Sequence, residues 1–216
     1  EISEGTYLLE ETLVCKDGVH IQGAVDSDGN PTTILDAQGL GQVFGAVYTN
    51  EGTMVENLVM INGVGEYGGG VRLAAADLIF RNCIIRDNHA LWHGGGMYIN
   101  LHSSITMIDC VIMNNVAQHP KWGNNGFGGA FRSTSSGMFR LVDCTVTGNY
   151  ADGGIGGIMG GSEEAPLILE RTRVCGNTAP STPQSGGVFT ILGGCIEDDC
   201  DSCDVTVPAD LNFDGI

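Results

Sequence analysis

The residues best suited to acid–base or metal chemistry gather in one short segment that holds Arg86, Asp87, His89 and His93. The ordinary pKa of histidine lies near neutral pH, so either histidine could move a proton or bind a metal beside Asp87. Arg86 could act as the base of a lyase only beside an acidic calcium cluster, and no basic residue matches it in the neighbouring repeats. Histidines exposed on a turn explain this segment more simply. We therefore assign no catalytic residue, and the sequence favours a protein that is not an enzyme without excluding one.

Two tryptophans could contact a sugar. Trp92 lies within the same segment, and Trp122 follows Lys121 on a longer insertion. An exposed indole ring beside polar groups can stack on a sugar ring. The alternative is that both rings only cover the side of the protein.

The last residues carry a third kind of chemistry, the spacing of a calcium loop. Asp210, Asn212 and Asp214 alternate with other residues and are followed by Gly215. Carboxylate and amide oxygens at this spacing bind calcium, and the glycine permits the sharp turn between them. The later ligands and the flanking helices are missing from the sequence, so the site is incomplete. An ordinary Asp/Asn turn is the alternative, and calcium is the one cofactor that the sequence suggests.

The remaining acidic residues do not form an obvious catalytic pair. A glycoside hydrolase needs two carboxylates about 5 to 10 Å apart on one face. Asp109 and Asp143 precede equivalent cysteines in the repeat described next, so they should lie on one outward face with Asn82 and Arg171. That column could hold a cation, or it could be a solvated polar stripe.

A repeated unit must position all these side chains. From residue 68 onward the chain shows blocks with a glycine pair or triplet, a short apolar run, a polar turn, a second apolar run and an Asn-x-Ala ending. The asparagines that align are Asn62, Asn88, Asn115, Asn149 and Asn177. Asparagine accepts the left-handed conformation of a tight bend, and its amide can bond to the asparagines above and below. We therefore predict a ladder of stacked asparagines.

The length of the repeat and its short β-rich runs select the fold. Runs of about four residues separated by Gly and Asn turns cannot form helix pairs, and the frames of leucine-rich repeats and propeller blades are absent. A parallel β-helix, in which each block is one coil of three short strands, satisfies the pattern. Equivalent side chains would then stack at about 4.8 Å. The glycine groups would form corners that have no room for a side chain.

The frame GGG-[VM]-x-[LI]…[DN]-C-x-[IV]-x-x-N-x-A resembles the right-handed β-helix repeats of secreted and surface-displayed bacterial proteins, including polymorphic outer-membrane-protein-like repeats. Residues 4–39 are similar to the first coils of that superfamily, and the likeness extends to about residue 194. The resemblance implies an all-β, right-handed parallel β-helix. It does not imply one activity, because this fold hosts lyases, hydrolases, adhesins and fibres.

The tail resembles the start of a dockerin-type module, in which residues matching Asp210, Asn212 and Asp214 supply calcium ligands. We therefore expect a β-helix over 1–194, a Cys-rich acidic linker over 195–207 and the start of a calcium loop over 208–216. The resemblance also suggests that the chain is a piece of a longer secreted protein.

The cysteines form two groups. Three of them, Cys83, Cys110 and Cys144, occupy one repeat position and should be small buried residues. The cluster Cys195, Cys200 and Cys203 suits a disulfide clip better than a zinc knuckle, because no histidine is near and acids flank it. This favours an oxidising, extracellular setting.

Charge limits the partners. The chain has 26 acidic and 9 basic residues and a formal charge of −17. Such a surface repels nucleic acid and anionic lipid, and it disfavours polyanions unless a cation bridges. No apolar stretch approaches the roughly 20 residues of a membrane span.

We therefore expect an extracellular, non-enzymatic scaffold with a structural or adhesive role that could assemble end to end into filaments. The alternative is a module that binds or cleaves polysaccharide, and a protein partner of the acidic tail is a third possibility.

Overall fold

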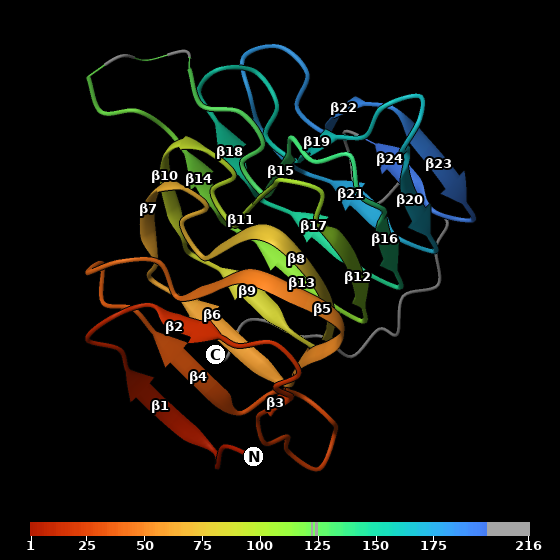
Figure 1. Ribbon diagram of the computed structural model, residues 1–216. Helices are drawn as coiled ribbons and strands as arrows, with labels where there is room; N and C mark the ends of the chain where they lie inside the picture. Colours follow the sequence, from red (N-terminus) through yellow and green to blue (C-terminus); the bar gives the residue numbers. More distant parts are fainter. Residues whose placement is uncertain (122, 124, 198–216) are drawn as a thin grey trace.

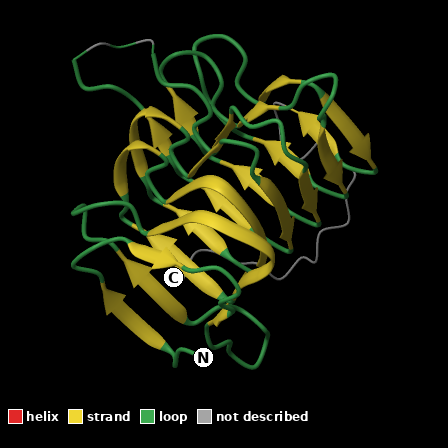
Figure 2. Ribbon diagram, in the orientation of Figure 1, coloured by secondary structure: helices red, strands yellow, loops and turns green. Residues whose placement is uncertain are grey.

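The protein is a solenoid built from parallel β-strands. The computed structural model describes residues 1–121, 123 and 125–197. Within these residues all pairs of named strands are parallel, and Figure 2 shows only strands and loops. The strands stack in chain order from β1 at one end to β23 and β24 at the other (Figure 1). The described residues contain no helix long and apolar enough to cross a membrane.

Three sheets form the walls of the solenoid. The first sheet stacks eight strands in the order β1 (Gly5–Leu8), β4 (Thr33–Asp36), β6 (Leu58–Ile61), β9 (Ile84–Arg86), β13 (Val111–Met113), β17 (Thr145–Thr147), β21 (Arg173–Cys175) and β24 (Cys195–Glu197). The second sheet has four strands, β7 (Val64–Tyr67), β10 (His89–His93), β14 (Val116–Ala117) and β18 (Tyr150–Ala151).

The third sheet has twelve strands because two long strands join two rows. The long strands are β5 (Phe44–Glu56) and β8 (Val71–Arg81). One row contains β2 (Leu13–Cys15), β11 (Met97–Asn100), β15 (Phe131–Ser133), β19 (Ile158–Gly160) and β22 (Ser185–Gly187). The other row contains β3 (Ile21–Gln22), β12 (Ser104–Ile108), β16 (Phe139–Val142), β20 (Leu167–Glu170) and β23 (Phe189–Leu192). The predicted β-helix is confirmed, and coils beyond β8 divide this wall into two short strands.

Alternation along each strand fills the core. In β8 the side chains of Leu73, Leu78 and Phe80 are buried, whereas Arg72 and Arg81 are exposed. Inward-facing positions one coil apart stack on one another, so a continuous apolar column runs through the solenoid. Each additional coil therefore extends the same core.

The glycine groups form the corner between the second and third sheets. Gly94 has a φ of 67°, in the left-handed region that favours glycine. Gly95 follows it, and a Cβ at Gly95 would lie 2.6 Å from the backbone carbon of Val116. Backbones of successive coils are stacked here through the bond from the amide of Gly96 to the carbonyl of Gly129, 3.0 Å long. The corner is therefore closed to side chains.

The positions with left-handed backbone differ from those predicted. Asn62 and Asn114 have φ near 55°, but the stacked asparagine Asn115 is not among the residues with positive φ. The bend is made by the residue before the stacked asparagine, and glycines 148 and 176 make it in later coils. The register pairs Val64 with His89, so Gly63 and not Asn62 stands opposite Asn88. Asn62 is therefore one position out of the ladder, and its amide bonds instead to Asp36.

The solenoid reaches further along the chain than the segment 1–194. The last described strand, β24, pairs with β21, so residues 195–197 belong to the first sheet and not to a separate linker. The start of the calcium loop, 208–216, lies outside the described residues.

Candidate functional site

The segment with Arg86, His89 and His93 does not form one site. Arg86 forms an ion pair with Asp87, with 2.5 Å between guanidinium and carboxylate. His89 donates from Nε2 to the carbonyl of Gln118, 3.0 Å away. His93 instead faces aromatic rings. These three side chains therefore have separate partners, and we find no acid–base pair in the segment.

No metal centre is evident among the described residues. There, no group of three or more His, Cys, Asp or Glu side chains is arranged to hold an ion. The predicted ligands Asp210, Asn212 and Asp214 lie outside the described residues, so calcium binding there stays a prediction. Cys200 and Cys203 lie outside them too, so the proposed clip with Cys195 also stays a prediction.

In the predicted outward column, the positive charge is supplied by a side chain of the protein, the guanidinium of Arg171. Arg171 contacts both carboxylate oxygens of Asp143 at 2.7 Å and also bonds to Glu170. These hydrogen bonds hold the pKa of Asp143 below its ordinary value. Burial, followed by the charge of Asp143, raises the pKa of Asp109 in the coil below. The column is therefore a structural ion pair between coils.

Four asparagine side chains form a buried ladder inside the solenoid. The amide of Asn88 donates to Oδ1 of Asn115 at 3.0 Å, Asn115 to Asn149 at 3.0 Å, and Asn149 to Asn177 at 2.9 Å. Gln184 ends the ladder by accepting from Asn177 at 2.9 Å. Each amide oxygen also accepts the backbone amide of the asparagine or glycine one coil earlier. These bonds satisfy buried polar groups, so the ladder stabilises the fold.

Three cysteines directly precede the strands β9, β13 and β17 of the first sheet in neighbouring coils. Cys83, Cys110 and Cys144 are buried and have free thiols. Burial raises the pKa of the Cys83 and Cys144 thiols well above the ordinary value. A buried thiol that stays protonated is a poor nucleophile, so Cys83 and Cys144 serve as packing residues.

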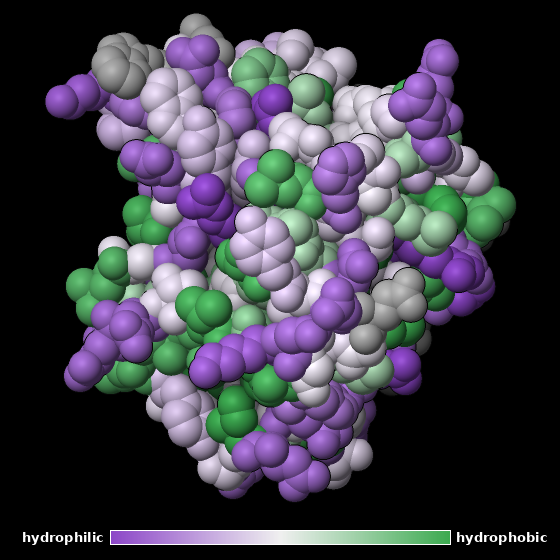
Figure 3. Space-filling model, in the orientation of Figure 1, coloured by the Kyte–Doolittle hydropathy of each residue, from purple (hydrophilic) through white to green (hydrophobic). Residues whose placement is uncertain are grey.

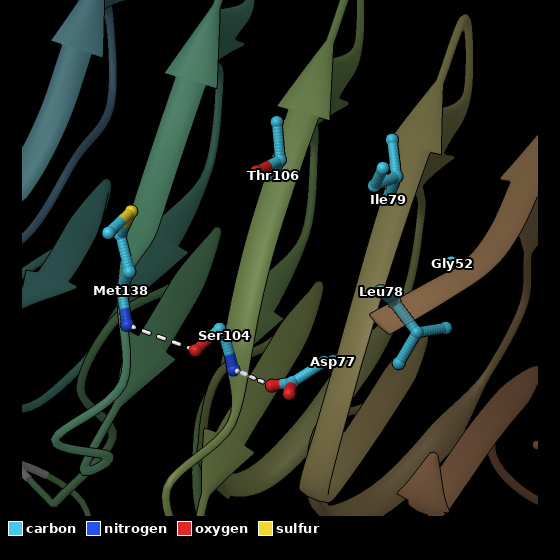
Figure 4. A pocket seen from close by; sticks show the side chains of 7 residues that line it. All are labelled: Gly52, Asp77, Leu78, Ile79, Ser104, Thr106 and Met138. Atoms are coloured by element: carbon cyan, nitrogen blue, oxygen red, sulfur yellow. Dashed lines mark hydrogen bonds between the residues drawn. The ribbon is translucent and has the colours of Figure 1, made fainter. Parts of the chain in front are cut away.

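The outer wall carries a shallow pocket of about 430 Å³, shown in Figure 4. Asp77 Oδ1 accepts the backbone amide of Ser104 at 2.9 Å, and Oγ of Ser104 accepts the amide of Met138 at 3.3 Å. Ile79 and Thr106 line the pocket further along the strands. Among the described lining residues Asp77 is the one titratable side chain, so these residues do not provide the pair of carboxylates that glycoside hydrolysis requires.

A group of aromatic and basic side chains lies at the glycine corner. We call Tyr67, His93, Tyr98, Phe127 and Arg132 the corner strip. His93 is paired with Tyr67 on one side and Phe127 on the other, with ring centroids 5.6 and 5.7 Å apart. Tyr98 and Arg132 are register neighbours on the adjacent strands β11 and β15 of the third sheet. Tyr98 approaches Tyr67 to 5.0 Å, and the Arg132 guanidinium lies 5.5 Å from the Phe127 ring centroid.

The corner strip exists because the corner has no side chains. A Cβ at Gly68 would lie 3.2 Å from Cβ of Tyr98, and one at Gly128 would lie 2.9 Å from Cβ of Arg132. Glycine at these positions allows the rings of the second sheet to contact the side chains of Tyr98 and Arg132 in the third sheet. The signal was present in the sequence as a ring before three of the five glycine groups, followed five residues later by Arg72, Tyr98 or Arg132.

Electrostatics distinguish the corner strip from the rest of the surface. Burial, then the nearby charge of Arg132, lowers the pKa of His93 to about 4. Burial also lowers the pKa of Arg132, which keeps its charge because arginine is protonated in proteins. Nδ1 of His93 and Nε of Arg132 are buried without hydrogen-bond partners. Arg132 therefore places a positive charge beside neutral rings, and Arg72, the register neighbour of Tyr98 one coil earlier, places a second positive charge near them.

The predicted sugar-stacking residues are placed differently. Trp92 packs against the ring of His119, with centroids 4.4 Å apart. Trp122 lies outside the described residues. Sugar contact by either ring stays a prediction.

Comparison with known proteins gives one match. The family model described as a right handed beta helix region matches residues 14–167. No curated protein and no solved structure matches the chain. The matched range includes the corner strip, the outer pocket and most of the asparagine ladder.

Proposed function

This chain belongs to the right-handed β-helix family, and from that fold we propose that it acts outside the cell as a non-enzymatic scaffold with a structural or adhesive role, whose solenoids associate end to end. The observation that carries the proposal is the pair of unpaired strand edges at the two ends. Among the described residues β1 pairs only with β4, and β24 pairs only with β21. Parallel strands at both ends would allow one solenoid to continue into the next.

Exposed apolar side chains at both ends support the association. Leu8 and Val14 are 63% and 60% exposed on the first coil, and Ile191 and Leu192 are about half exposed on the last. In Figure 3 hydrophobic atoms reach the surface around the first coils. Burying such surface between copies would stabilise a contact by about 25 cal/mol per Å².

Acidic residues at the first coil would oppose this contact. Glu1, Glu4, Glu10 and Glu11 are all exposed there, in a chain of charge −17. Like charges at a contact are screened over about 10 Å at 0.1 M salt and over about 3 Å at 1 M. We therefore expect association to increase with salt, and also with calcium if the tail binds it.

Light scattering after size exclusion, with electron microscopy, would test the association over a range of protein, salt and calcium concentrations. The variant Val14→Asp should lower association, because it places a charge on the outward face of an edge strand. Met138→Asp is the matched control, since Met138 is 62% exposed on an internal coil. Dispersed monomers under all conditions, or equal effects of the two variants, would refute end-to-end assembly.

A polysaccharide-binding or polysaccharide-cleaving role is the second candidate, and the corner strip favours its binding form. The acid–base residues needed for cleavage are not together among the described residues. Incubation with acidic and neutral polysaccharides, followed for new reducing ends and for absorbance of unsaturated products, separates the two roles. Turnover that is lost in Arg86→Gln or His93→Gln would overturn the non-enzymatic proposal.

A further inference from the structure

The three buried cysteines Cys83, Cys110 and Cys144 form one row across consecutive coils. The amide of Val111 donates to the carbonyl of Cys83 at 2.9 Å, and the amide of Thr145 donates to the carbonyl of Cys110 at 2.9 Å. The residues that follow the three cysteines are register partners on adjacent parallel strands. Such strands lie about 4.8 Å apart. Each outer cysteine is therefore one strand spacing from Cys110 and two spacings from the other outer cysteine.

The three side chains point the same way. In each coil Sγ lies 3.2 or 3.3 Å from the carbonyl oxygen of the residue two positions earlier. The thiols of Cys83 and Cys144 are also hydrogen-bonding partners of Cys110. All three thiols are buried, and the structure holds them in the reduced form. The sulfur atoms therefore make a continuous row inside the solenoid, with Cys110 in the middle.

Other residue types end the row on both sides. The register places Leu58 opposite Cys83 in the preceding coil and Thr172 opposite Cys144 in the following coil. The hydroxyl of Thr172 accepts the amide of Cys144 at 3.2 Å and donates to the carbonyl of Leu141 at 3.0 Å. The row therefore contains three thiols, of which one disulfide can use two.

The spacing of the row selects which thiols can pair. The Cα atoms of a disulfide lie about 4.4 to 6.8 Å apart. One strand spacing falls within this range, so Cys110 can reach either neighbour after a small approach of the two strands. Two spacings, about 9.5 Å, exceed the range, so Cys83 and Cys144 cannot bond to each other.

We propose that the row is a site of covalent modification, in which Cys110 forms one disulfide with either Cys83 or Cys144 and leaves the other as a thiol. The oxidant is a small-molecule disulfide such as oxidised glutathione. The Cys110 thiol loses its proton and attacks one glutathione sulfur, which releases the first reduced glutathione. An outer cysteine then loses its proton and attacks Sγ of Cys110, which releases the second.

The two protons lost by the cysteines end on the two glutathione molecules, so atoms and electrons balance. Because all three thiols are buried in the closed solenoid, these steps take place while the coils are still open during folding. The product joins β13 covalently to β9 or to β17, in the middle of the solenoid. The site does not depend on end-to-end association or on polysaccharide binding.

Peptide mapping of the full chain tests the pairing directly. Trypsin cleaves after Lys and Arg, so Cys83, Cys110 and Cys144 fall in the separate peptides 82–86, 87–121 and 141–171, and each of these peptides has one cysteine. The chain would be refolded with oxidised and reduced glutathione, alkylated under denaturing conditions, digested and analysed by mass spectrometry.

We expect peptide 87–121 to be linked to 82–86 or to 141–171. These links together should be at least about tenfold more abundant than a direct link between 82–86 and 141–171. Alkylation of all three cysteines in the refolded protein would refute the proposal. A direct link between the two outer peptides as abundant as the others would refute it too.

Variants identify the middle cysteine. Cys110→Ser should abolish both links, whereas Cys83→Ser and Cys144→Ser should each retain the link that remains possible. A hydroxyl is tolerated at this position of a coil, because Thr172 is buried there in the following coil. Cys15→Ser is the matched control, since Cys15 is a buried free thiol outside the row and its loss should leave both links.

Circular dichroism checks that each variant is folded, and mapping of the unaltered protein decides the proposal even where a variant fails to fold. A link between the two outer peptides in Cys110→Ser, or loss of both links in Cys15→Ser, would contradict the pairing through Cys110.

Discussion

Replacing Asn115 by alanine would remove the centre of the buried asparagine ladder. Its Oδ1 accepts the backbone amide of Asn88 at 3.1 Å and the side-chain amide of Asn88 at 3.0 Å. Its Nδ2 donates to Asn149 at 3.0 Å and to the carbonyl of Ile85 at 2.9 Å. Each lost bond costs about 1 kcal/mol, and a buried donor left unpaired costs about 1 to 3 kcal/mol. We therefore expect Asn115→Ala to lower the free energy of unfolding by about 4 kcal/mol.

The adjacent asparagine provides a matched control. Asn114 is exposed and has a φ of 55°, and glycines 148 and 176 make the same bend in later coils. Asn114→Gly should therefore change the free energy of unfolding by less than about 1 kcal/mol. Guanidinium unfolding followed by circular dichroism measures both values. A loss below about 1 kcal/mol in Asn115→Ala, or equal losses in the two variants, would contradict the ladder as a source of stability.

Three further predictions concern pH and the corner. Because Arg171 lowers the pKa of Asp143 in the folded state, their pairing stabilises the protein at pH values above the ordinary carboxyl pKa. This stabilisation is lost as pH falls through the lowered pKa. Denaturant curves should therefore show that the difference in stability between wild type and Asp143→Asn shrinks below about pH 4. The His93 ring signals should titrate near 4 by NMR, and stability should fall as pH drops from 6.5 toward that value, since the unfolded chain binds the proton first. A midpoint near 6.5 would contradict burial. Gly95→Ala should lower stability by more than about 3 kcal/mol in thermal melts, whereas Gly41→Ala, whose added Cβ would lie 3.5 Å from its nearest neighbour, should cost little.

The sequence was sufficient to predict the fold because the same structural signals recur in each repeat. Glycine groups and apolar alternation recur in several coils, so an error in one coil is corrected by the others. The parallel β-helix, its glycine corners and the family are confirmed. The division of one wall into two short strands follows the polar turn between the two apolar runs of each block, such as residues 101–103 between β11 and β12.

The register of the first ladder position was harder to predict. Asn62 fits the pattern of stacked asparagines, but it has left-handed backbone and aligns with Asp87. Asparagine is favoured both at a left-handed bend and in a ladder of amides, so the residue type alone does not distinguish the two roles. Gly63 takes the ladder position, where its backbone amide donates to Asn88.

The corner strip was missed for a different reason. His93 was singled out for acid–base chemistry, whereas its neighbours come from other coils and from both sides of the corner. Phe127 follows an insertion whose length hides its alignment with Tyr67. Arg132 is one of nine basic residues, and only the stacked coils show that no described carboxylate forms an ion pair with it.

The asparagine ladder has a direction. Every donor amide points toward the coil that follows, from Asn88 to Asn177, so the side-chain dipoles add along the solenoid axis. Gln184 breaks this sequence because its own Nε2 donates back to the carbonyl of Asn177 at 3.0 Å. A duplicated coil placed between Asn115 and Asn149 would continue this row of donors in the same direction, so the ladder allows the solenoid to lengthen from within.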